Sequence, residues 1–198
     1  GQKSGDVYAL DPDKGGAVVW HNKVGRGGFL GGVHWGMSAN GDSLFVPIAD
    51  TTITGRFTGP VSPGIHALDP TSGDLRWYTP SVADCDGKSP IPVCDQGMSA
   101  AITSTDQLVF AGSLDGNLNV YDSLSGEILW SFDTFGDFES VSGDTALGGS
   151  IESDGPVLYK GHVLINSGYQ FGARMPGNAL MVFSLPPEAD LARSTRDE

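Results

Sequence analysis

The sequence predicts an all-β protein built as a β-propeller, because it contains an internal repeat of a size typical of propeller blades. Residues 5–20, 64–77 and 116–130 share one pattern: a short strand, a turn opened by Asp, a glycine, and a second strand that ends in Trp. The three tryptophans, at positions 20, 77 and 130, are 57 and 53 residues apart. A period near fifty residues with about four strands per unit is typical of propellers.

Each part of the repeat has a local explanation. The side chains of Asp11, Asp69 and Asp122 can accept hydrogen bonds from backbone N–H groups two residues further on, which favours a turn. The glycine that closes each turn (Gly15 or Gly16, Gly73, Gly126) supplies the positive φ that a tight hairpin needs. We expect the final Trp to pack between one sheet and the next. These repeated residues are therefore interpreted as architecture.

The remaining sequence agrees with many short strands joined by tight turns. The chain has 29 Gly and 12 Pro among its 198 residues, with apolar alternation at 43–47 and 107–111, and no stretch with a sustained helical period. The predicted strands are 6–11, 17–22, 43–48, 64–69, 74–78, 99–104, 107–112, 117–122, 127–133, 156–160, 163–168 and 178–184.

The last unit differs from the others. Residues 177–184 have the strand but lack both the Asp-Gly turn and the Trp. Beyond Pro186 and Pro187 the sequence is polar and charged, with no apolar run to bury. We therefore expect one partial propeller over 1–185 and a flexible C-terminal tail over 186–198.

At roughly 55 residues per blade, the chain accounts for about three and a half blades, which are too few for a closed ring of about six to eight. It also begins without Met, inside a repeat. An open half-ring would expose the faces of its terminal sheets. We expect a piece of a larger propeller, or a chain that pairs with a second polypeptide; a ring closed by two copies is a further possibility.

Four segments, 2–11, 31–36, 97–101 and 109–116, resemble the second half of pyrroloquinoline quinone (PQQ) dependent alcohol dehydrogenases, which are quinoprotein β-propellers. Within that family the chain is most similar to poly(vinyl alcohol) dehydrogenases. The correspondence runs in order from residue 2 to about 184. The resemblance implies that the three and a half blades are the C-terminal part of an eight-bladed ring, with PQQ and calcium as cofactors.

The resemblance also implies which residues approach the cofactor. Lys3 stands two residues before Gly5, where the family has a Lys or Arg that reaches the quinone carbonyls. A cation there would stabilise negative charge on the reduced quinone. An ordinary exposed lysine in a turn is the alternative interpretation.

His34 and Trp35 occupy the place of a common Asn-Trp pair that follows two glycines, here Gly31 and Gly32. The glycines would let the backbone approach a flat ligand. His instead of Asn is a departure from the family, although an imidazole could still donate to a carbonyl or carboxylate oxygen. A structural His-Trp pair is the alternative.

Gln96 and Gly97 lie where the next blade passes near the cofactor, but the aromatic residue expected before the glycine is missing. The neighbouring Asp95 is not assigned as the catalytic base. In the family that base, the calcium ligands and the Trp beneath the quinone come from earlier blades. The expected calcium ligands, like the catalytic residues, thus lie outside this chain.

Cys85 and Cys94 are the only cysteines. A disulfide closing so short a loop would stabilise the fold by about 2–3 kcal/mol, and it would persist in the periplasm or outside the cell. Two free thiols are the alternative. The spacing fits neither covalent haem nor a zinc site.

The formal net charge is −13, from 24 acidic and 11 basic residues. Such a negatively charged surface disfavours binding to nucleic acid and to anionic membranes. It suits binding of a cationic electron acceptor such as a c-type cytochrome. No apolar stretch is long enough to span a membrane.

Two functions follow as hypotheses. By resemblance, the chain belongs to a periplasmic or secreted enzyme in which a carboxylate deprotonates an alcohol and hydride passes to PQQ. Alternatively, it belongs to a propeller that binds or assembles other proteins without chemistry. The upstream residues would discriminate between the two.

Overall fold

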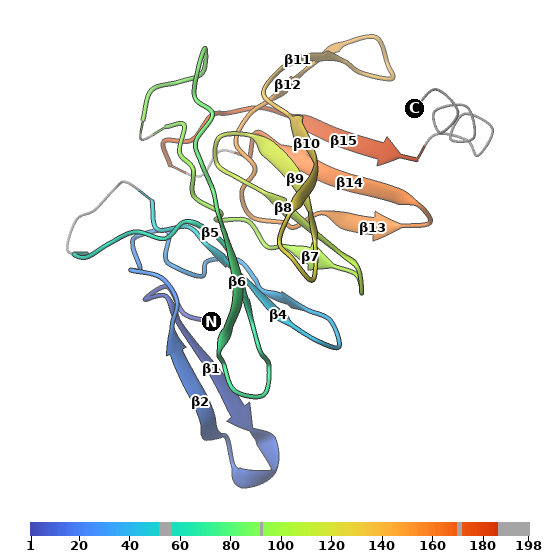
Figure 1. The fold of residues 1–198 in the computed structure, drawn as a ribbon. Coiled ribbons are helices and arrows are strands. Elements are labelled where there is room, and N and C mark those ends of the chain that lie inside the picture. Colours follow the sequence, from blue (N-terminus) through green and yellow to red (C-terminus); the bar gives the residue numbers. More distant parts are fainter. Residues whose placement is uncertain (52–56, 92, 170–171, 186–198) are drawn as a thin grey trace.

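The computed structural model describes residues 1–51, 57–91, 93–169 and 172–185, and in these it consists of strands, turns and one 3-10 helix (Figure 1). The all-β prediction is therefore confirmed. The elements are β1 Asp6–Asp11, η1 Pro12–Lys14, β2 Ala17–Lys23, β3 Ser38–Ala39, β4 Leu44–Ile48, β5 Gly64–Leu68, β6 Leu75–Pro80, β7 Thr103–Ser104, β8 Leu108–Gly112, β9 Asn117–Asp122, β10 Ile128–Asp133, β11 Gly136–Glu139, β12 Thr145–Gly148, β13 Val157–Tyr159, β14 His162–Ser167 and β15 Ala179–Ser184.

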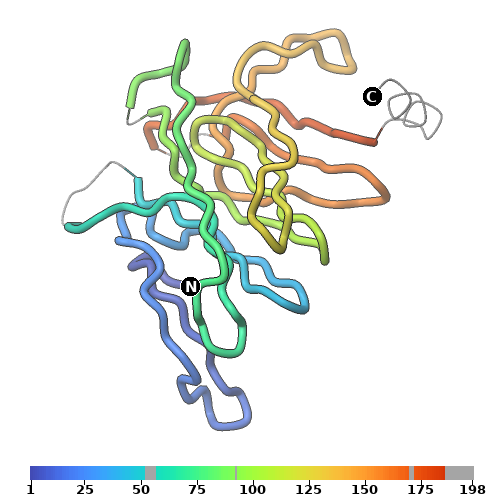
Figure 2. The backbone as a smooth tube through the Cα atoms, viewed as in Figure 1, coloured from blue at the N-terminus to red at the C-terminus, as the bar shows by residue number. Residues whose placement is uncertain are grey.

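Every sheet is an antiparallel meander in which sequence neighbours pair. Two sheets have four strands, β3 to β6 and β7 to β10, and the last has three, β13 to β15. The hairpins β1–β2 and β11–β12 form separate two-stranded sheets. Figures 1 and 2 show the sheets following one another through space in chain order, from the blue hairpin to the red strand β15. This up-and-down order within each sheet is the order of propeller blades.

The hydrophobic core is divided into layers between successive sheets. Val7 of the first hairpin packs with Val46 and Ile48 of β4. Phe45 and Ile65 pack with residues of the next sheet in a second cluster, and a third cluster joins that sheet to the last one. Each sheet thus packs mainly on the sheets next to it in chain order, as expected for stacked repeats.

The repeated tryptophans join one sheet to the next, as predicted. The indole N–H of Trp20 donates to the carbonyl of Pro70 at 3.0 Å, and that of Trp77 donates to the carbonyl of Ser123 at 3.1 Å. Both acceptors lie in the Asp-led turn of the following sheet. Trp130 has no such turn after it. It stacks instead on Phe132 and contacts Phe183 edge to face, and it is 41% exposed.

The structure corrects the strand predictions in three places. Of the predicted strand 99–104, only Thr103–Ser104 pairs as a strand, because the preceding backbone bonds to neighbouring sheets: Met98 N–H donates to the Ile48 carbonyl and Ala101 N–H to that of Ser153. Strands β3, β11 and β12 were not predicted. The first has two residues, and the other two form a polar, mostly exposed hairpin.

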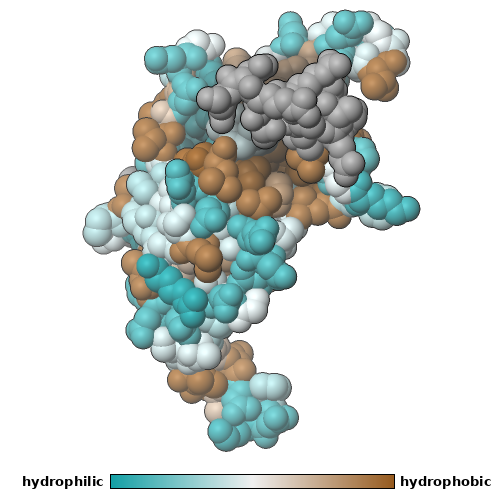
Figure 3. Space-filling model, turned by 45° about the vertical axis from the view of Figure 1, so that its right-hand side comes forward, coloured by the Kyte–Doolittle hydropathy of each residue, from teal (hydrophilic) through white to brown (hydrophobic). Residues whose placement is uncertain are grey.

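Apolar side chains are exposed at both ends of the array (Figure 3). On the first hairpin these are Leu10, Val18 and Val19, and on the last sheet they include Leu180 and Val182, all more than half exposed. The predicted tail 186–198 lies outside the described residues. Within the described residues, no helix has the length and apolar character needed to cross a membrane.

Candidate cofactor wall

Lys3 is held in place by its backbone. Its carbonyl accepts a hydrogen bond from Gly32 N–H at 2.8 Å, while its side chain is exposed. A Cβ on Gly32 would lie 2.3 Å from Cα of Gly5, and one on Gly31, where φ is +91°, would lie 3.0 Å from Cγ of Lys3. The two glycines predicted to admit a flat ligand therefore make room for residues 3–5. They form a cradle for the lysine.

His34 belongs to a buried chain of hydrogen bonds. Its Nδ1 lies 2.7 Å from Oγ of Ser99, whose hydroxyl donates to Oε1 of Glu152 at 2.9 Å. The direct distance from Nδ1 to Oε1 is 3.7 Å. The side chains of His34 and Glu152 are 8% and 0% exposed, and Ser99 is fully buried. The three residues precede β3, precede β7 and follow β12, so three blades meet at this point.

Charged side chains surround this chain. Burial and the nearby ammonium of Lys3 lower the pKa of His34 to about 4, so the imidazole is neutral at pH 7. Burial raises the pKa of Glu152 above its usual value, opposed by the Ser99 hydrogen bond and the positive charges of Arg174 and Lys3. Arg174 is buried and interacts electrostatically with Asp95 as well as with Glu152. Lys3, His34 and Glu152 thus share one electrostatic environment.

Trp35 lies outside this buried chain of hydrogen bonds, at an open groove. It is 47% exposed, its ring centroid is 5.1 Å from that of His34, and it lines an open groove of about 470 Å³. The other walls of the groove come from the segment before β7, the loop after β12 and the last sheet, and they include Ala101, Asp154 and Leu180. The groove runs beside the His34 chain.

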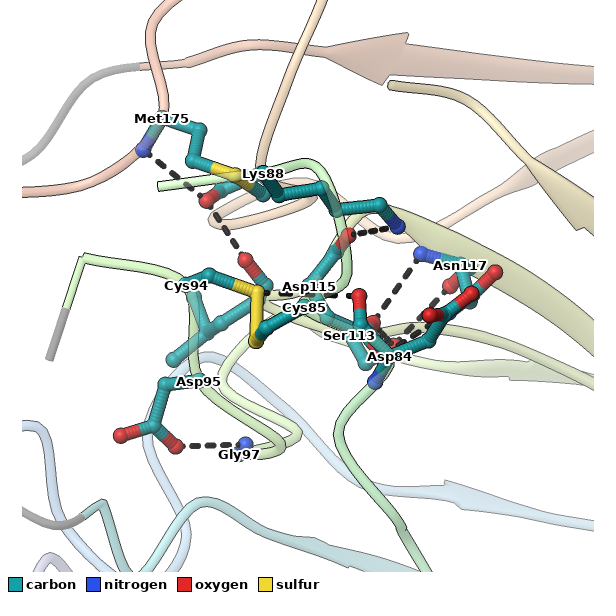
Figure 4. The surroundings of a disulfide bond; sticks show 12 residues. Asp84, Cys85, Lys88, Cys94, Asp95, Gly97, Ser113, Asp115, Asn117 and Met175 are labelled. Atoms are coloured by element: carbon teal, nitrogen blue, oxygen red, sulfur yellow. Dashed lines mark hydrogen bonds between the residues drawn. A yellow bond between two sulfur atoms is a disulfide. The ribbon is translucent and has the colours of Figure 1, made fainter. Parts of the chain in front are cut away.

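Gln96 and Gly97 sit directly after the disulfide loop. Gly97 N–H donates to Oδ1 of the buried Asp95 at 2.9 Å (Figure 4). A Cβ on Gly97 would lie 2.7 Å from the carbonyl oxygen of Ala49, so this glycine is needed for packing against the preceding sheet. Gln96 is half-buried.

The predicted disulfide is present: Cys85 and Cys94 are bonded, with Cα atoms 5.9 Å apart and Cys94 fully buried (Figure 4). Within the loop, the ammonium of Lys88 donates to the Asp115 carbonyl at 2.8 Å and to Oδ1 of Asp133 at 3.0 Å. The bridge and this lysine fix the segment that leads into Asp95.

Of the predicted cofactor residues, the structure places Lys3 within electrostatic range of His34, Trp35 beside His34, and Gln96 and Gly97 on the neighbouring loop. Sequence reasoning missed Ser99, Glu152 and Arg174. The only available signal was Glu152 itself, a glutamate that directly follows the stretch 146–151 of small and apolar residues. No group of three or more His, Cys, Asp or Glu side chains that could hold a metal occurs among the described residues.

Comparison with known proteins agrees with this architecture. A family model described as outer membrane protein assembly factor BamB, built on PQQ repeats, matches residues 3–147 and 62–173. Polyvinylalcohol dehydrogenases from a Pseudomonas species and from Sphingopyxis sp. (strain 113P3) are 35% and 33% identical over 93% of this chain. The chain spans only 30% of the length of each of these relatives.

Among solved structures, BamB from Moraxella catarrhalis matches with a TM-score of 0.53 and 20% identity, over 83% of this chain and 38% of that one. At that identity the match shows a shared fold. Together with the repeats and the meander sheets, these matches show that the chain belongs to the PQQ-repeat family of quinoprotein-type β-propellers, and that it resembles polyvinyl alcohol dehydrogenases.

Proposed function

We propose that this chain is part of a periplasmic or secreted PQQ-dependent dehydrogenase that oxidises alcohols, and that it supplies one wall of the cofactor pocket. The relatives with 33–35% identity support the reaction class. The observation that carries the proposal for this wall is the packing of Lys3 against Gly31 and Gly32, just before His34, in a register that the family aligns with the quinone.

The donor set fits the cofactor on this side. PQQ carries carbonyl and carboxylate oxygens, all of which accept hydrogen bonds, and the exposed ammonium of Lys3 is a donor and a positive charge. When bound, PQQ supplies the hydride acceptor for alcohol oxidation. Lys3 would hold its oxygens and stabilise the negative charge that develops there. Trp35 would cover the pocket edge beside His34.

Calcium does not fit the described residues, since they provide no set of ligands. In this proposal the calcium ligands, like the base and the floor of the pocket, belong to other blades. No step at the residues of this chain depends on the metal. Polyvinyl alcohol and small secondary alcohols are the proposed substrate classes, and a c-type cytochrome is the proposed electron acceptor; one relative, from Thauera butanivorans, is named 1-butanol dehydrogenase (cytochrome c).

The test is substitution of Lys3 in the intact protein that contains this chain. Lys3→Ala should weaken PQQ binding and slow dye-linked alcohol oxidation by a factor on the order of 100, because a preorganised charge acts mainly in the transition state. Lys3→Arg should be milder, since the charge is kept. Lys14→Ala, whose side chain is 77% exposed and paired with Asp11, is the matched control. Unchanged quinone affinity and rate in Lys3→Ala would make Lys3 a plain turn residue.

The proposed compartment can be tested separately, through the redox state of the two cysteines. Because the structure contains no free cysteine among the described residues, protein isolated from the periplasm should resist alkylation until a reductant is added. Immediate labelling of both thiols would contradict the proposed compartment.

A second candidate function is a binding or assembly scaffold without chemistry. The description of the matching family and the BamB structure favour it. A scaffold would bind no PQQ. Quenching of intrinsic tryptophan fluorescence by PQQ, titrated in the intact protein with calcium present, therefore discriminates between the two candidates.

A further inference from the structure

A crevice of about 310 Å³ lies between the two four-stranded sheets, and it shares no lining residue with the proposed cofactor wall. One side is the end of β6 and the segment after it, and the other is formed by β9 and β10. Two lining residues, Val82 and Ile128, are 79% and 46% exposed, so the crevice opens to solvent. Both sides belong to complete sheets of this chain, so the crevice does not depend on further blades for its walls.

The third repeat lacks a pair of rings that the first two repeats have, and the crevice lies at that position. In each repeat, the residue directly after the Trp pairs across the hairpin with a residue of the preceding strand. These pairs are Tyr8 with His21, His66 with Tyr78, and Asn119 with Ser131. The first two pairs are stacked rings, with centroids 4.5 Å and 4.1 Å apart. In the third repeat an amide and a hydroxyl take their place, and both line the crevice.

The floor of the crevice is organised by the buried carboxylate of Asp115. Its two oxygens accept hydrogen bonds from the Ser113 hydroxyl, from Asn117, through N–H at 3.1 Å and Nδ2 at 2.8 Å, and from Asp84 N–H at 3.0 Å (Figure 4). The carboxylate is therefore saturated by the protein itself. Because Asn117 gives the nitrogen of its amide to Asp115, its Oδ1 remains as an acceptor.

The charges around the crevice argue against an ionic ligand. Asp84 and Asp115 line it, and no Lys or Arg of the described residues does, which disfavours an anion. The ammonium of Lys88 is directed elsewhere, to the Asp115 carbonyl and to Asp133. A cation would need free carboxylate oxygens, and because those of Asp115 are occupied, Asp84 alone could supply them. A neutral ligand therefore fits best.

The groups that remain match the hydroxyl groups of an alcohol. Oδ1 of Asn117 accepts a hydrogen bond, and the hydroxyl of Ser131 both donates and accepts. Neither forms a hydrogen bond with another described residue. The apolar side chains of Val82 and Ile128 line the same space and can contact a carbon chain. A ligand with several hydroxyl groups on a short carbon chain uses all of these groups.

We infer that this crevice binds the hydroxyl groups of a neutral polyol. One ligand hydroxyl donates to Oδ1 of Asn117, another bonds with Ser131, and the carbon chain packs against Val82 and Ile128. Two sources share this chemistry, a segment of an alcohol polymer and a small free polyol. The polymer source rests on the proposed function, because the polymer is a proposed substrate there. In that case the crevice holds a part of the polymer that does not react.

The main test variant restores the rings of the second repeat. Asn119→His with Ser131→Tyr reproduces the pair of His66 and Tyr78 in the same register and should fill the crevice. A second variant, Ser131→Val, removes the hydroxyl at an exposed strand position where a β-branched residue is favoured, so it should fold if the first does not. The matched control is Thr145→Val, which removes a hydroxyl from the exposed start of β12, outside the crevice.

Binding is measured by isothermal titration calorimetry in the intact protein that contains this chain, without PQQ. The two ligands are an oligomer of polyvinyl alcohol and sorbitol. Both crevice variants should bind more weakly by a factor on the order of 10, because hydrogen bonds are lost, and Thr145→Val should bind as the wild type does. Binding of the oligomer alone would identify the polymer as the source, and binding of sorbitol would identify a small polyol. Absence of binding in the wild type, or wild-type affinity in the crevice variants, would overturn the inference.

Alcohol oxidation by the PQQ-loaded protein separates this inference from the proposed function. If the polymer is the ligand, the ring-restored variant should raise KM for the polymer about 10-fold, with kcat and KM for a small secondary alcohol unchanged. An unchanged KM for the polymer would exclude the polymer as the source. A wild type that binds polyol in the crevice but oxidises no alcohol would refute the proposed function and leave the binding site standing.

Discussion

At the scale of single residues, two of the repeated glycines are required for two separate structural reasons. Gly73 and Gly126 were predicted as turn residues, and both have a positive φ, 79° and 75°. Each also lies against the indole of the preceding sheet, since a Cβ on Gly126 would be 2.5 Å from Cε3 of Trp77. Local turn chemistry can be read from sequence. Contact with a residue about fifty positions earlier depends on how sheets stack.

A matched pair of substitutions measures how much the contact with the indole contributes to the cost of replacing the glycine. Gly126→Ala and Gly16→Ala both place alanine at positive φ, 75° and 80°, but nothing lies within 4 Å of a Cβ on Gly16. Both should lose about 1–2 kcal/mol from the backbone conformation. Gly126→Ala should lose about 1–3 kcal/mol more, because it displaces Trp77. Urea unfolding of the two variants gives the difference between their unfolding free energies. Equal losses would show that the Trp77 side chain can move aside without loss of stability.

His34 makes a pH-dependent contribution to stability. Its folded pKa is lowered to about 4 from 6.5, so the unfolded state binds the proton first as the pH falls. Folding stability is therefore lost as pH falls from about 6.5 to 4. His34→Asn should flatten the dependence of the unfolding free energy on pH in this window. The buried His66 also has a lowered pKa and leaves a residual slope in both proteins. Identical slopes in the two proteins would contradict this account.

At the scale of elements, the repeats could be predicted from the sequence. The joints between them, where the chain of one blade bonds to a neighbouring blade, could not. Periodicity located most strands within one or two residues, because alternation and Asp-Gly turns are local signals. Residues 99–102 read as a strand by the same alternation, yet their backbone bonds to neighbouring blades. Ser99 and Glu152 lie at such joints, which explains why their pairing with His34 could not be predicted from sequence spacing.

The disulfide is an element-scale feature with a measurable contribution. Replacing both Cys85 and Cys94 with serine should lower the unfolding free energy by about 2–3 kcal/mol, because the unfolded chain regains the freedom of the short loop. Urea unfolding of the double variant measures this loss, and chemically reduced wild type is the control that should match it. Lys88 still ties the loop to Asp133 in the variant, so the fold should survive. A double variant as stable as the oxidised wild type would show that this lysine suffices.

At the scale of the whole molecule, the layers of the core explain both what is stable and what is exposed. Interior sheets have an apolar cluster on both faces, whereas the first hairpin and the last sheet have one only on the side of their neighbour. Leu10, Val18 and Val19 at one end, and Leu180 and Val182 at the other, remain in water. In a propeller, adjoining blades would cover such faces.

Residues 1–198 expressed alone should therefore associate. Two uncovered apolar faces at opposite ends allow each molecule to bind two others, and heterologous contacts of that kind form open assemblies as readily as closed ones. Light scattering should show oligomers whose mass rises with concentration.

The variant Val19→Lys with Leu180→Lys places a charge on each face and should shift the population toward monomer without changing the β-sheet circular dichroism spectrum. Lysines at the exposed polar positions Ser125 and Ser142 control for net charge, since they add the same two cations away from both faces. A wild-type chain that is monomeric at every concentration tested would mean that these faces are too small to drive association, and the stacked layers would then be sufficient for a stable molecule without neighbouring blades.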